Sequence, residues 1–389
     1  MDALRASETF RDAVAVADSL RPTSPVYCLR PHTVRELTRR FVRAFPGETL
    51  YAVKCNPHPR ILDAVRAGGV DGFDTASIPE IAQIAGGWPE AEAFYMNPVR
   101  PPGAATTARR TYGVCVFALD HMEELAKLRR EVADPGEVVA AVRIAPPTTG
   151  ARMDLACKFG AGPSDAVALL QAVREAGMQP GIAFHVGSQC VEPESYTRAL
   201  RHAGDLAAGA GVKPVLLDVG GGFPAPYTNE PIPPITAFTD TVRQGLGQVD
   251  TAPGCRVLAE PGRAITAAGA SLLVQVHLRA GGRLHINDGV FGSLAEIEAT
   301  GIRPPVRVVR PDGPPPTGAP RVFDAAGPTC DSVDMIQAAF TLPDDVSTGD
   351  WLELDCMGAY TNASASRFNG FDPCTFVEVA DPPPCVPAP

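Results

Sequence analysis

Lys54 has the most suggestive position of any residue in this sequence. It ends the mostly apolar run 49–54 and is followed at once by Cys55-Asn-Pro-His-Pro59. An ammonium at the inner end of a strand is costly to bury, so three uses are expected: an ion pair, a lowered pKa, or condensation with a carbonyl as a Schiff base. A lysine that reaches from a strand end into solvent is the commoner alternative, and Lys54 alone does not exclude it.

Two glycine-containing segments could hold an anion. The triplet 220–222 follows the apolar run 214–219, and backbone N–H groups at such a turn can converge on a phosphate. A plain tight turn explains the triplet equally well. Glu260-Pro-Gly-Arg263 follows the next apolar run and supplies a carboxylate, another glycine and an arginine for the same anion. A salt bridge between Glu260 and Arg263 is the alternative.

His185, in Phe184-His-Val-Gly-Ser-Gln189, adds an imidazole after a further apolar run. A lone histidine at such a position is more often structural than catalytic. A lysine, a flat ring, an inward acid and a phosphate cradle nevertheless match the requirements of pyridoxal phosphate. These are an amine for its aldehyde, a carboxylate for its ring nitrogen, and donors for its phosphate.

The elements that must position these residues alternate between short apolar strands and amphipathic helices from about residue 30 to 265. Strands are expected near 49–54, 72–75, 93–97, 114–119, 138–144, 181–186, 214–219 and 256–260. This alternation predicts a (β/α)8 barrel, with a doubly wound sheet as the alternative. Sites of such barrels collect at the carboxyl ends of the strands. The expected strands end in polar or glycine residues: Lys54, Asp74, Asn97, Asp120, Arg143, His185, Gly220 and Glu260.

After residue 265 the pattern changes to strands and turns, which predicts an all-β domain. Strands are expected at 271–278, 283–287, 306–310, 321–323, 351–355 and 375–379, and the proline-rich segment 308–320 reads as a loop. The run 24–29 could join this sheet. The predicted division is a cofactor-binding barrel at 30–265, a β-domain made of 1–29 and 266–380, and a flexible tail at 381–389.

Composition limits the partners. A net charge of −10 without a basic run argues against nucleic acid and anionic membranes, and leaves small molecules or proteins. No apolar stretch reaches the length of a membrane-spanning helix, and the N-terminus lacks the apolar core of a signal peptide. The ten cysteines form no Cys-x-x-Cys pair, so no metal site is expected. These features predict a reduced, cytoplasmic protein.

Nine motifs together resemble the ornithine decarboxylase family, whose members are pyridoxal-phosphate enzymes of the alanine-racemase-like fold. The resemblance extends over roughly residues 24–375, with the motifs in order and at the family's spacing. The motifs are Tyr51-Ala-Val-Lys-Cys-Asn56, Phe73-Asp-Thr-Ala-Ser77, Phe184-His-Val-Gly-Ser188, Asp218-Val-Gly-Gly-Gly-Phe-Pro224, Glu260-Pro-Gly-Arg263, Asn287-Asp-Gly-Val290, Gly327-Pro-Thr-Cys-Asp331, Met357-Gly-Ala-Tyr360 and Phe368-Asn-Gly-Phe371.

The resemblance implies a role for each matching position. Lys54 is similar to the Schiff-base lysine, His185 to the ring that stacks on the cofactor, and Glu260 to the carboxylate that keeps the pyridine nitrogen protonated. Positions similar to the phosphate site are Ser188, Gly220, Gly221, Gly222, Gly262, Arg263 and Tyr360. Supporting polar positions around cofactor and substrate are Asp74, Glu80, Arg143 and Lys158.

Cys330 and Asp331 resemble a pair that the second subunit of the family's homodimer contributes. The cysteine returns a proton to the substrate carbon after carbon dioxide leaves, and the aspartate contacts the distal amino group. The resemblance therefore implies a homodimer with shared active sites. Without it, a cysteine before an aspartate would read as structural.

The segment 293–301 departs from the family pattern. Ornithine decarboxylases bring an acid to the substrate's distal ammonium here, and an ungapped alignment puts Thr300 at that position. The acid is missing unless Glu296 or Glu298 replaces it. Loss of a charge-assisted hydrogen bond would cost about 1.5–3 kcal/mol in recognition. Thr300, Glu296 and Phe291 are the substrate-contacting candidates beside Asp331.

Four functions are compatible with the sequence. The leading hypothesis is a pyridoxal-phosphate-dependent decarboxylase of ornithine, lysine, arginine or a modified amino acid, whether free or attached to a carrier. A diaminopimelate decarboxylase is the next, although that group resembles Cys-Glu-Ser where this chain has Cys330-Asp-Ser332. An amino-acid racemase of the same superfold is the third. The fourth is an inactive homologue that regulates a partner, which the retention of Lys54 and Cys330 disfavours.

Overall fold

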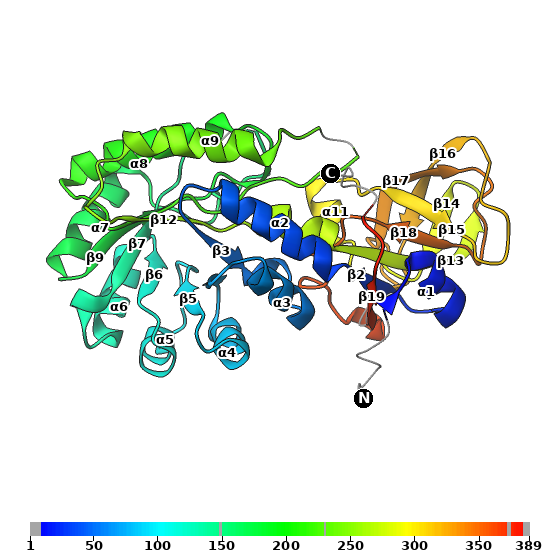
Figure 1. Cartoon of the computed structure of the whole chain (residues 1–389), viewed down its shortest axis with the longest axis horizontal. Helices are drawn as coiled ribbons and strands as arrows, with labels where there is room; N and C mark the ends of the chain where they lie inside the picture. The colour runs from blue at the N-terminus through cyan, green and yellow to red at the C-terminus, as the bar shows by residue number, and fades with distance from the viewer. Residues whose placement is uncertain (1–8, 148–149, 229–230, 372–374, 384–389) are drawn as a thin grey trace.

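The structure is a computed structural model that describes residues 9–147, 150–228, 231–371 and 375–383. Two bodies lie side by side along its long axis (Figure 1). Eight parallel strands close into a barrel at one end, and a mixed nine-stranded sheet forms the other. The predicted fold class, a (β/α)8 barrel followed by a β-domain, is confirmed.

The barrel strands are short and buried, as parallel strands covered by helices must be. In chain order they are β3 (Glu48–Ala52), β4 (Gly72–Thr75), β5 (Glu92–Tyr95), β6 (Val116–Leu119), β7 (Val139–Arg143), β9 (Gln179–Ala183), β11 (Leu216–Asp218) and β12 (Arg256–Ala259). The barrel closes where Leu258 and Ala259 of β12 pair with Glu48 and Thr49 of β3. Closure therefore places the ends of the first and last barrel strands next to each other.

Helices surround the barrel, and each buries an apolar face against the strands. They are α2 (Pro31–Ala44), α3 (Pro59–Ala67), α4 (Ile78–Gly87), α5 (Ala104–Tyr112), α6 (Met122–Glu131), α7 (Pro163–Glu175), α8 (Glu194–Ala210) and α9 (Ile235–Gly245). In Figure 1, α8 and α9 run together along one edge of the barrel. Side chains such as Leu50, Phe94 and Leu258 fill the barrel interior, so it is a packed core.

The nine-stranded sheet draws on both ends of the chain. Its strands are β1 (Thr9–Phe10), β2 (Val26–Leu29), β13 (Ala270–Ala280), β14 (Arg283–Ile286), β15 (Val306–Val309), β16 (Pro320–Ala326), β17 (Met335–Pro343), β18 (Trp351–Leu354) and β19 (Thr375–Val379). Strand β2 lies between β19 and β13, so the N-terminal run joins this sheet as the sequence suggests.

The β-domain differs from the sequence prediction in three respects. It is not all-β, because α1 (Ala13–Leu20), α10 (Arg263–Thr266) and α11 (Ala295–Thr300) accompany the sheet. Strand β17 was not predicted, and β15 runs two residues into the segment expected to be a loop. A further ribbon, β8 (Ala151–Met153) paired with β10 (Ser188–Cys190), lies after barrel strands and also escaped prediction. Its strands have only three residues each, too few for a pattern to show.

Arg30 joins the two ends of the chain through a buried polar cluster. Its guanidinium donates to Ser271 Oγ at 3.0 Å, to Glu353 Oε1 at 3.1 Å and to Asp381 Oδ2 at 3.0 Å. The side chains of Arg30 and Glu353 are 0% and 1% exposed. Asp381, the first residue of the segment expected to be flexible, is thus anchored, while residues 384–389 lie outside the described residues.

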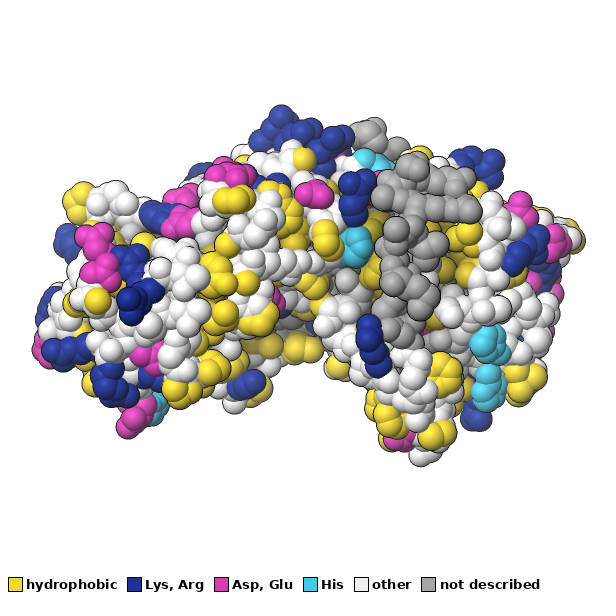
Figure 2. Space-filling view, turned by 90° about the horizontal axis from the view of Figure 1, so that it is seen from below, with side chains coloured by type: hydrophobic (Ala, Val, Ile, Leu, Met, Phe, Trp, Pro, Cys, Tyr) yellow, Lys and Arg dark blue, Asp and Glu magenta, His cyan; other side chains and the backbone are white. Residues whose placement is uncertain are grey.

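The molecule is hollowed between its two bodies when seen from below the view of Figure 1 (Figure 2). Within the described ranges, no helix combines the length and the apolar character that crossing a membrane requires.

We expect Arg30→Ala to lower the free energy of unfolding by about 3–5 kcal/mol, because it removes the fully buried cation of this cluster and leaves Glu353 Oε1 without its arginine, with only Arg307 on the other oxygen. Urea denaturation followed by circular dichroism measures this. Arg40→Ala is the matched control, since Arg40 pairs with Glu36 at the surface and its loss should cost about 1 kcal/mol or less. Equal losses in the two variants would contradict the assigned role of the cluster.

Candidate active site

Lys54 lies just beyond the end of β3, in the tight turn Val53–Cys55. Its Nζ donates a hydrogen bond to Asp74 Oδ2, and Asp74 belongs to β4, the neighbouring barrel strand. Burial lowers the pKa of Lys54, but the Asp74 and Glu260 carboxylates outweigh that effect and raise the pKa. The Lys54 side chain is 44% exposed and that of Asp74 is 1% exposed. The ammonium is therefore held by a buried acid at the rim of the barrel and remains accessible.

Two carboxyl groups stand across the rim at the ends of β11 and β12. Burial raises the pKa of Asp218 to about 6, against the lowering effect of its hydrogen bond from Gly220 N. Burial and the charges of Asp218 and Asp74 raise the pKa of Glu260 well above its usual range, while Lys54 opposes that shift. Among the described residues, Glu260 Oε1 is a buried atom that finds no hydrogen-bond donor. Glu260 is thus poised to take a proton or an N–H partner.

His185 follows β9 and is held as a neutral ring. Its Nδ1 accepts a hydrogen bond from Gly187 N at 3.0 Å. Burial and the nearby Arg143 and Lys54 cations keep the pKa of His185 well below its usual range. Arg143 and Lys158 lie against the ring of Phe159, at 5.2 and 4.8 Å from its centre. A neutral imidazole suits stacking against an aromatic ligand.

The glycine triplet leaves a cradle that no other residue type would leave open. Gly220 and Gly222 have φ of 68° and 103°, and a Cβ on Gly220 would lie 2.1 Å from Phe184 O. A Cβ on Gly221 would lie 2.8 Å from Glu260 O and 2.9 Å from His185 Nε2. At Gly262 a Cβ would meet Cys55 and lie 3.2 Å from Tyr360 Oη. These glycines therefore allow backbone, ring and hydroxyl to approach closely.

Arg263 begins α10 and is almost fully buried beside this cradle. Its Nη1 donates to Tyr227 Oη at 3.1 Å, and its Nη2 donates to Ser188 Oγ at 3.0 Å and to Glu296. Its guanidinium lies 5.0 Å from the centre of the Tyr360 ring. Arg263 Nε is buried and has no acceptor among the described residues. The expected alternative, a salt bridge between Glu260 and Arg263, is not formed, and Glu296 takes that place.

The arrangement fits pyridoxal phosphate. Among the buried polar atoms of the described site that lack partners are acceptors on Glu260 and Asp218 and a donor on Arg263. The Glu260 acceptor and the Arg263 donor are the two groups that a protonated ring nitrogen and a phosphate would satisfy. The glycine cradle lies beside Arg263, and Lys54 stands at the rim where an aldehyde would meet an amine.

Glu80 was expected near the cofactor, and the structure gives it a helix-capping role. Its N–H donates to Ser77 Oγ at 3.4 Å, and its Oε2 accepts from Ala76 N at 2.6 Å. These two hydrogen bonds start α4 immediately after the strand that carries Asp74. Glu80 thus supports the turn that follows Asp74.

Cys330 and Asp331 lie away from this rim, in the loop between β16 and β17 of the β-domain. Cys330 is exposed and Asp331 is half-buried; the Cys330 backbone N–H and Sγ contact Asn369 Oδ1 at 3.1 and 3.3 Å. Asp334 shapes this loop by accepting hydrogen bonds from the backbone N–H of Thr329 and from that of Val290. The described chain therefore presents the pair outwards.

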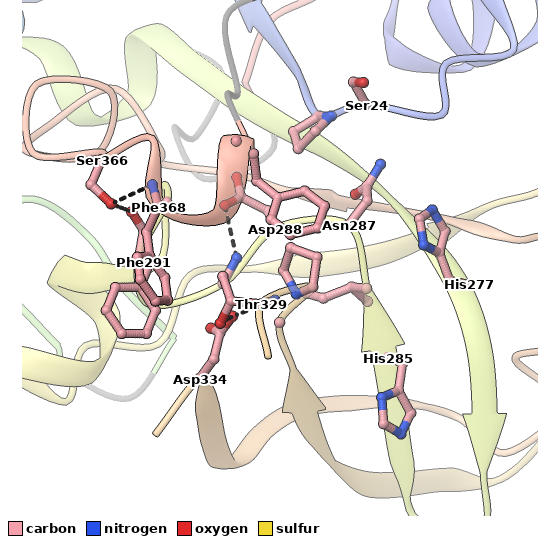
Figure 3. Close-up of a pocket in the computed structure, with 18 of the residues that line it drawn as sticks. Ser24, His277, His285, Asn287, Asp288, Phe291, Thr329, Asp334, Ser366 and Phe368 are labelled. Atoms are coloured by element: carbon pink, nitrogen blue, oxygen red, sulfur yellow. Dashed lines mark hydrogen bonds between the residues drawn. The ribbon is translucent and has the colours of Figure 1, made fainter. Parts of the chain in front are cut away.

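The Cys330 loop borders a cavity of about 550 Å³ in the β-domain (Figure 3). Phe291 lines this cavity and packs on Phe368 with ring centres 4.6 Å apart. Figure 3 shows His277 and His285 on neighbouring strands at its other side. Phe291, expected to contact substrate, thus lines the cavity that the Cys330 loop borders.

Thr300 is the last residue of α11, and its hydroxyl is occupied by the helix itself. Its Oγ1 donates to Glu296 O at 2.7 Å and accepts from Ile302 N at 3.3 Å. Glu298 is exposed on the other side of the helix, whereas the Glu296 side chain is 12% exposed. Of the two acids that could replace the missing one, Glu296 faces the site.

Sequence reasoning did not single out two residues of the site, Asp218 and Tyr227. Asp218 ends β11, but the polar end of that strand was assigned to Gly220 because the glycine triplet dominated the motif. The neighbouring carboxyl of Glu260 gives Asp218 its importance, and the pairing of β11 with β12 brings the two together. Tyr227 follows the strand by nine residues, and no spacing rule links it to Arg263.

Comparisons with known proteins agree with this site. Residues 32–267 match the family model described as "Pyridoxal-dependent decarboxylase, pyridoxal binding domain". An ornithine decarboxylase of Panagrellus redivivus is 34% identical, over 94% of this chain and 88% of its own length. That of Mus musculus is 33% identical, over 85% of this chain and 75% of its own.

Solved structures extend the likeness to the whole fold. The arginine decarboxylase of Paramecium bursaria Chlorella virus superposes with a TM-score of 0.83 at 27% identity, over 94% of this chain and 98% of that chain. The lysine/ornithine decarboxylase of Vibrio vulnificus, complexed with putrescine, gives 0.79 at 28% identity, over 94% and 96%.

Fold and site together define a pyridoxal-phosphate-dependent barrel enzyme with a β-domain. The chain belongs to the ornithine decarboxylase family, whose members are pyridoxal-phosphate-dependent decarboxylases of basic amino acids. The expected family, cofactor and enzyme class are therefore confirmed.

Gly221→Ala should weaken pyridoxal phosphate binding about tenfold or more, corresponding to about 1.4 kcal/mol, because its Cβ would press on His185 and Glu260. Titration of cofactor-free protein, followed by absorbance, measures the affinity. Gly162→Ala is the control, since a Cβ there meets nothing within 4 Å. Unchanged affinity in Gly221→Ala would show that the cradle does not hold the cofactor.

The raised carboxyl pKa values predict how stability depends on pH. Asp218 and Glu260 bind protons more tightly in the folded state, so their contribution to stability is full at low pH and is lost as pH rises through their raised pKa values, about 6 for Asp218. Asp218→Asn should flatten this decline in cofactor-free protein between about pH 4 and 6. Asp288 and His185 also titrate in both proteins, so the comparison isolates the Asp218 pair. Urea denaturation across that range measures the slopes, and parallel slopes would contradict the assignment.

Proposed function

We propose that this chain decarboxylates a free amino acid of the ornithine, lysine or arginine type and works as a homodimer with shared active sites. The observation that carries the proposal is the convergence of an accessible Lys54, an unpartnered Glu260 oxygen and an unpartnered Arg263 donor on one barrel rim. The relatives are named for these same substrates, and the Vibrio vulnificus enzyme was solved in complex with putrescine, the amine formed from ornithine.

Each side chain has a distinct task in this reaction. Pyridoxal phosphate supplies an electron sink that accepts the electrons of the bond broken when carbon dioxide leaves. Glu260 holds a proton at the ring nitrogen, which keeps that sink strong. His185 stays neutral, so it covers a ring face without competing for that proton. Asp74 holds the Lys54 ammonium until Nζ gives up its proton and acts as a nucleophile.

The second subunit supplies the remaining groups in this proposal. Cys330 is exposed and Asp331 half-buried on a β-domain loop, and around them lie exposed apolar side chains: Val333 at 62%, Phe368 at 41% and Phe371 at 44%. Such a patch favours burial against another protein surface. In the dimer, Cys330 Sγ would return a proton to the substrate carbon, and Asp331 would contact the distal amino group. We keep the cytoplasm as the expected compartment, consistent with eight free cysteines among the described residues.

Carbon dioxide release by the cofactor-loaded protein tests the reaction. The substrates are ornithine, lysine, arginine, diaminopimelate and the D-isomers. We expect release from at least one basic L-amino acid, and none from the same protein after Lys54→Ala. Borohydride should attach the cofactor to the wild-type protein and fail to do so in Lys54→Ala. Attachment in the variant would show that another lysine carries the cofactor. No carbon dioxide release from any of these amino acids would overturn the substrate proposal.

Mixed dimers test the shared site. Lys54→Ala and Cys330→Ala subunits each lack one component, and a mixed dimer regains one complete site only if the two residues act across the interface. Random pairing should restore about a quarter of the wild-type rate. A mixture no more active than the separate variants would place Cys330 outside the partner's site.

A further inference from the structure

Glu296 is the ion-pair partner of Arg263, the arginine proposed to bind the cofactor phosphate. Its carboxylate pairs with Arg263 Nη2, and the two side chains are 12% and 3% exposed. The same guanidinium donates to Ser188 and Tyr227, and only its Nε lacks an acceptor among the described residues. The phosphate-binding arginine is therefore already neutralised by an acid of the chain itself.

Two anions on this guanidinium would repel each other. A phosphate carries close to two negative charges near neutral pH, and the repulsion from a carboxylate is strong where little water screens it. Arg263 cannot retreat, because Tyr227, Ser188 and the Tyr360 ring hold it. Phosphate binding therefore favours departure of the Glu296 side chain from Arg263.

After leaving Arg263, the Glu296 carboxylate can pair with another cation in the site. Glu296 stands one turn before Thr300 on α11, and the main chain of that turn is held by the Thr300 hydroxyl and by buried Ile297. Thr300 is uncharged, and Glu298 is exposed. Glu296 is thus the acid of α11 that lies against the site, one turn from Thr300, which the family resemblance aligns with the acid for the substrate's distal end.

We propose that Glu296 changes partner during the catalytic cycle: it holds Arg263 in the cofactor-free protein and the distal ammonium of the substrate in the loaded enzyme. This inference rests on the proposed function and narrows it. The substrate then carries a positive charge at its distal end. The Glu296 carboxylate becomes available to select for that charge only after the cofactor is bound.

Cofactor titration tests the first half. Cofactor-free Glu296→Gln should bind pyridoxal phosphate about tenfold more tightly than wild type, because the competing carboxylate is gone and the side-chain shape is kept. Glu298→Gln is the matched control and should bind as wild type does. Equal or weaker binding by Glu296→Gln would show that Glu296 orients Arg263 for the phosphate, and would overturn the exchange.

Steady-state kinetics of the loaded enzyme test the second half. For the basic amino acid that the wild-type enzyme uses best, Glu296→Gln should raise KM about tenfold or more, with a smaller change in kcat. The variant should also show a smaller ratio of kcat/KM between this substrate and the analogue that lacks the distal amine. Glu298→Gln should leave both values unchanged. Unaltered discrimination in Glu296→Gln overturns this half. A wild-type enzyme inactive on every basic amino acid overturns the proposed function as well, while the titration still decides the exchange at Arg263.

Discussion

The Lys54 ammonium sits in a ring of carboxyl groups, and the rest of the site depends on that arrangement. Asp74 pairs with it directly, and Glu260 adds a second negative charge that raises its pKa. The same ammonium lowers the pKa of His185 and opposes the rise at Glu260. One charge therefore contributes to the protonation of both His185 and Glu260, so a change at Lys54 alters both groups.

Closure of the barrel makes this coupling possible. Lys54 and Glu260 are more than 200 residues apart in the chain, yet β3 and β12 pair side by side when the first and last strands meet. The carboxyl ends of all eight strands therefore lie at one rim of the barrel. The loops that follow the strands turn there with close backbone contacts and leave the site open. The fold thus gives the site rigid positions for its charges.

Solved structures of this fold hold agmatine or putrescine, and the present chain has Thr300 and Glu296 on the helix where our proposal places recognition of the substrate's distal end. The Thr300 hydroxyl already donates to and accepts from the main chain at the end of its own helix, so it is a poor ligand for a cation. Glu296 pairs with Arg263. The partner exchange that we propose for Glu296 would link substrate selection to cofactor binding through a single guanidinium.

The sequence by itself determined the strand and helix alternation, the polar strand ends and the motifs at Lys54, His185, Glu260 and Arg263, because these depend on local residue order. It could not show that Asp218 adjoins Glu260, that Tyr227 holds Arg263, or that Arg263 pairs with Glu296 and not with Glu260. Those contacts join residues from different strands and from the β-domain. Only tertiary structure decides them, because burial and neighbouring charge, not residue type, set which partner a polar side chain takes.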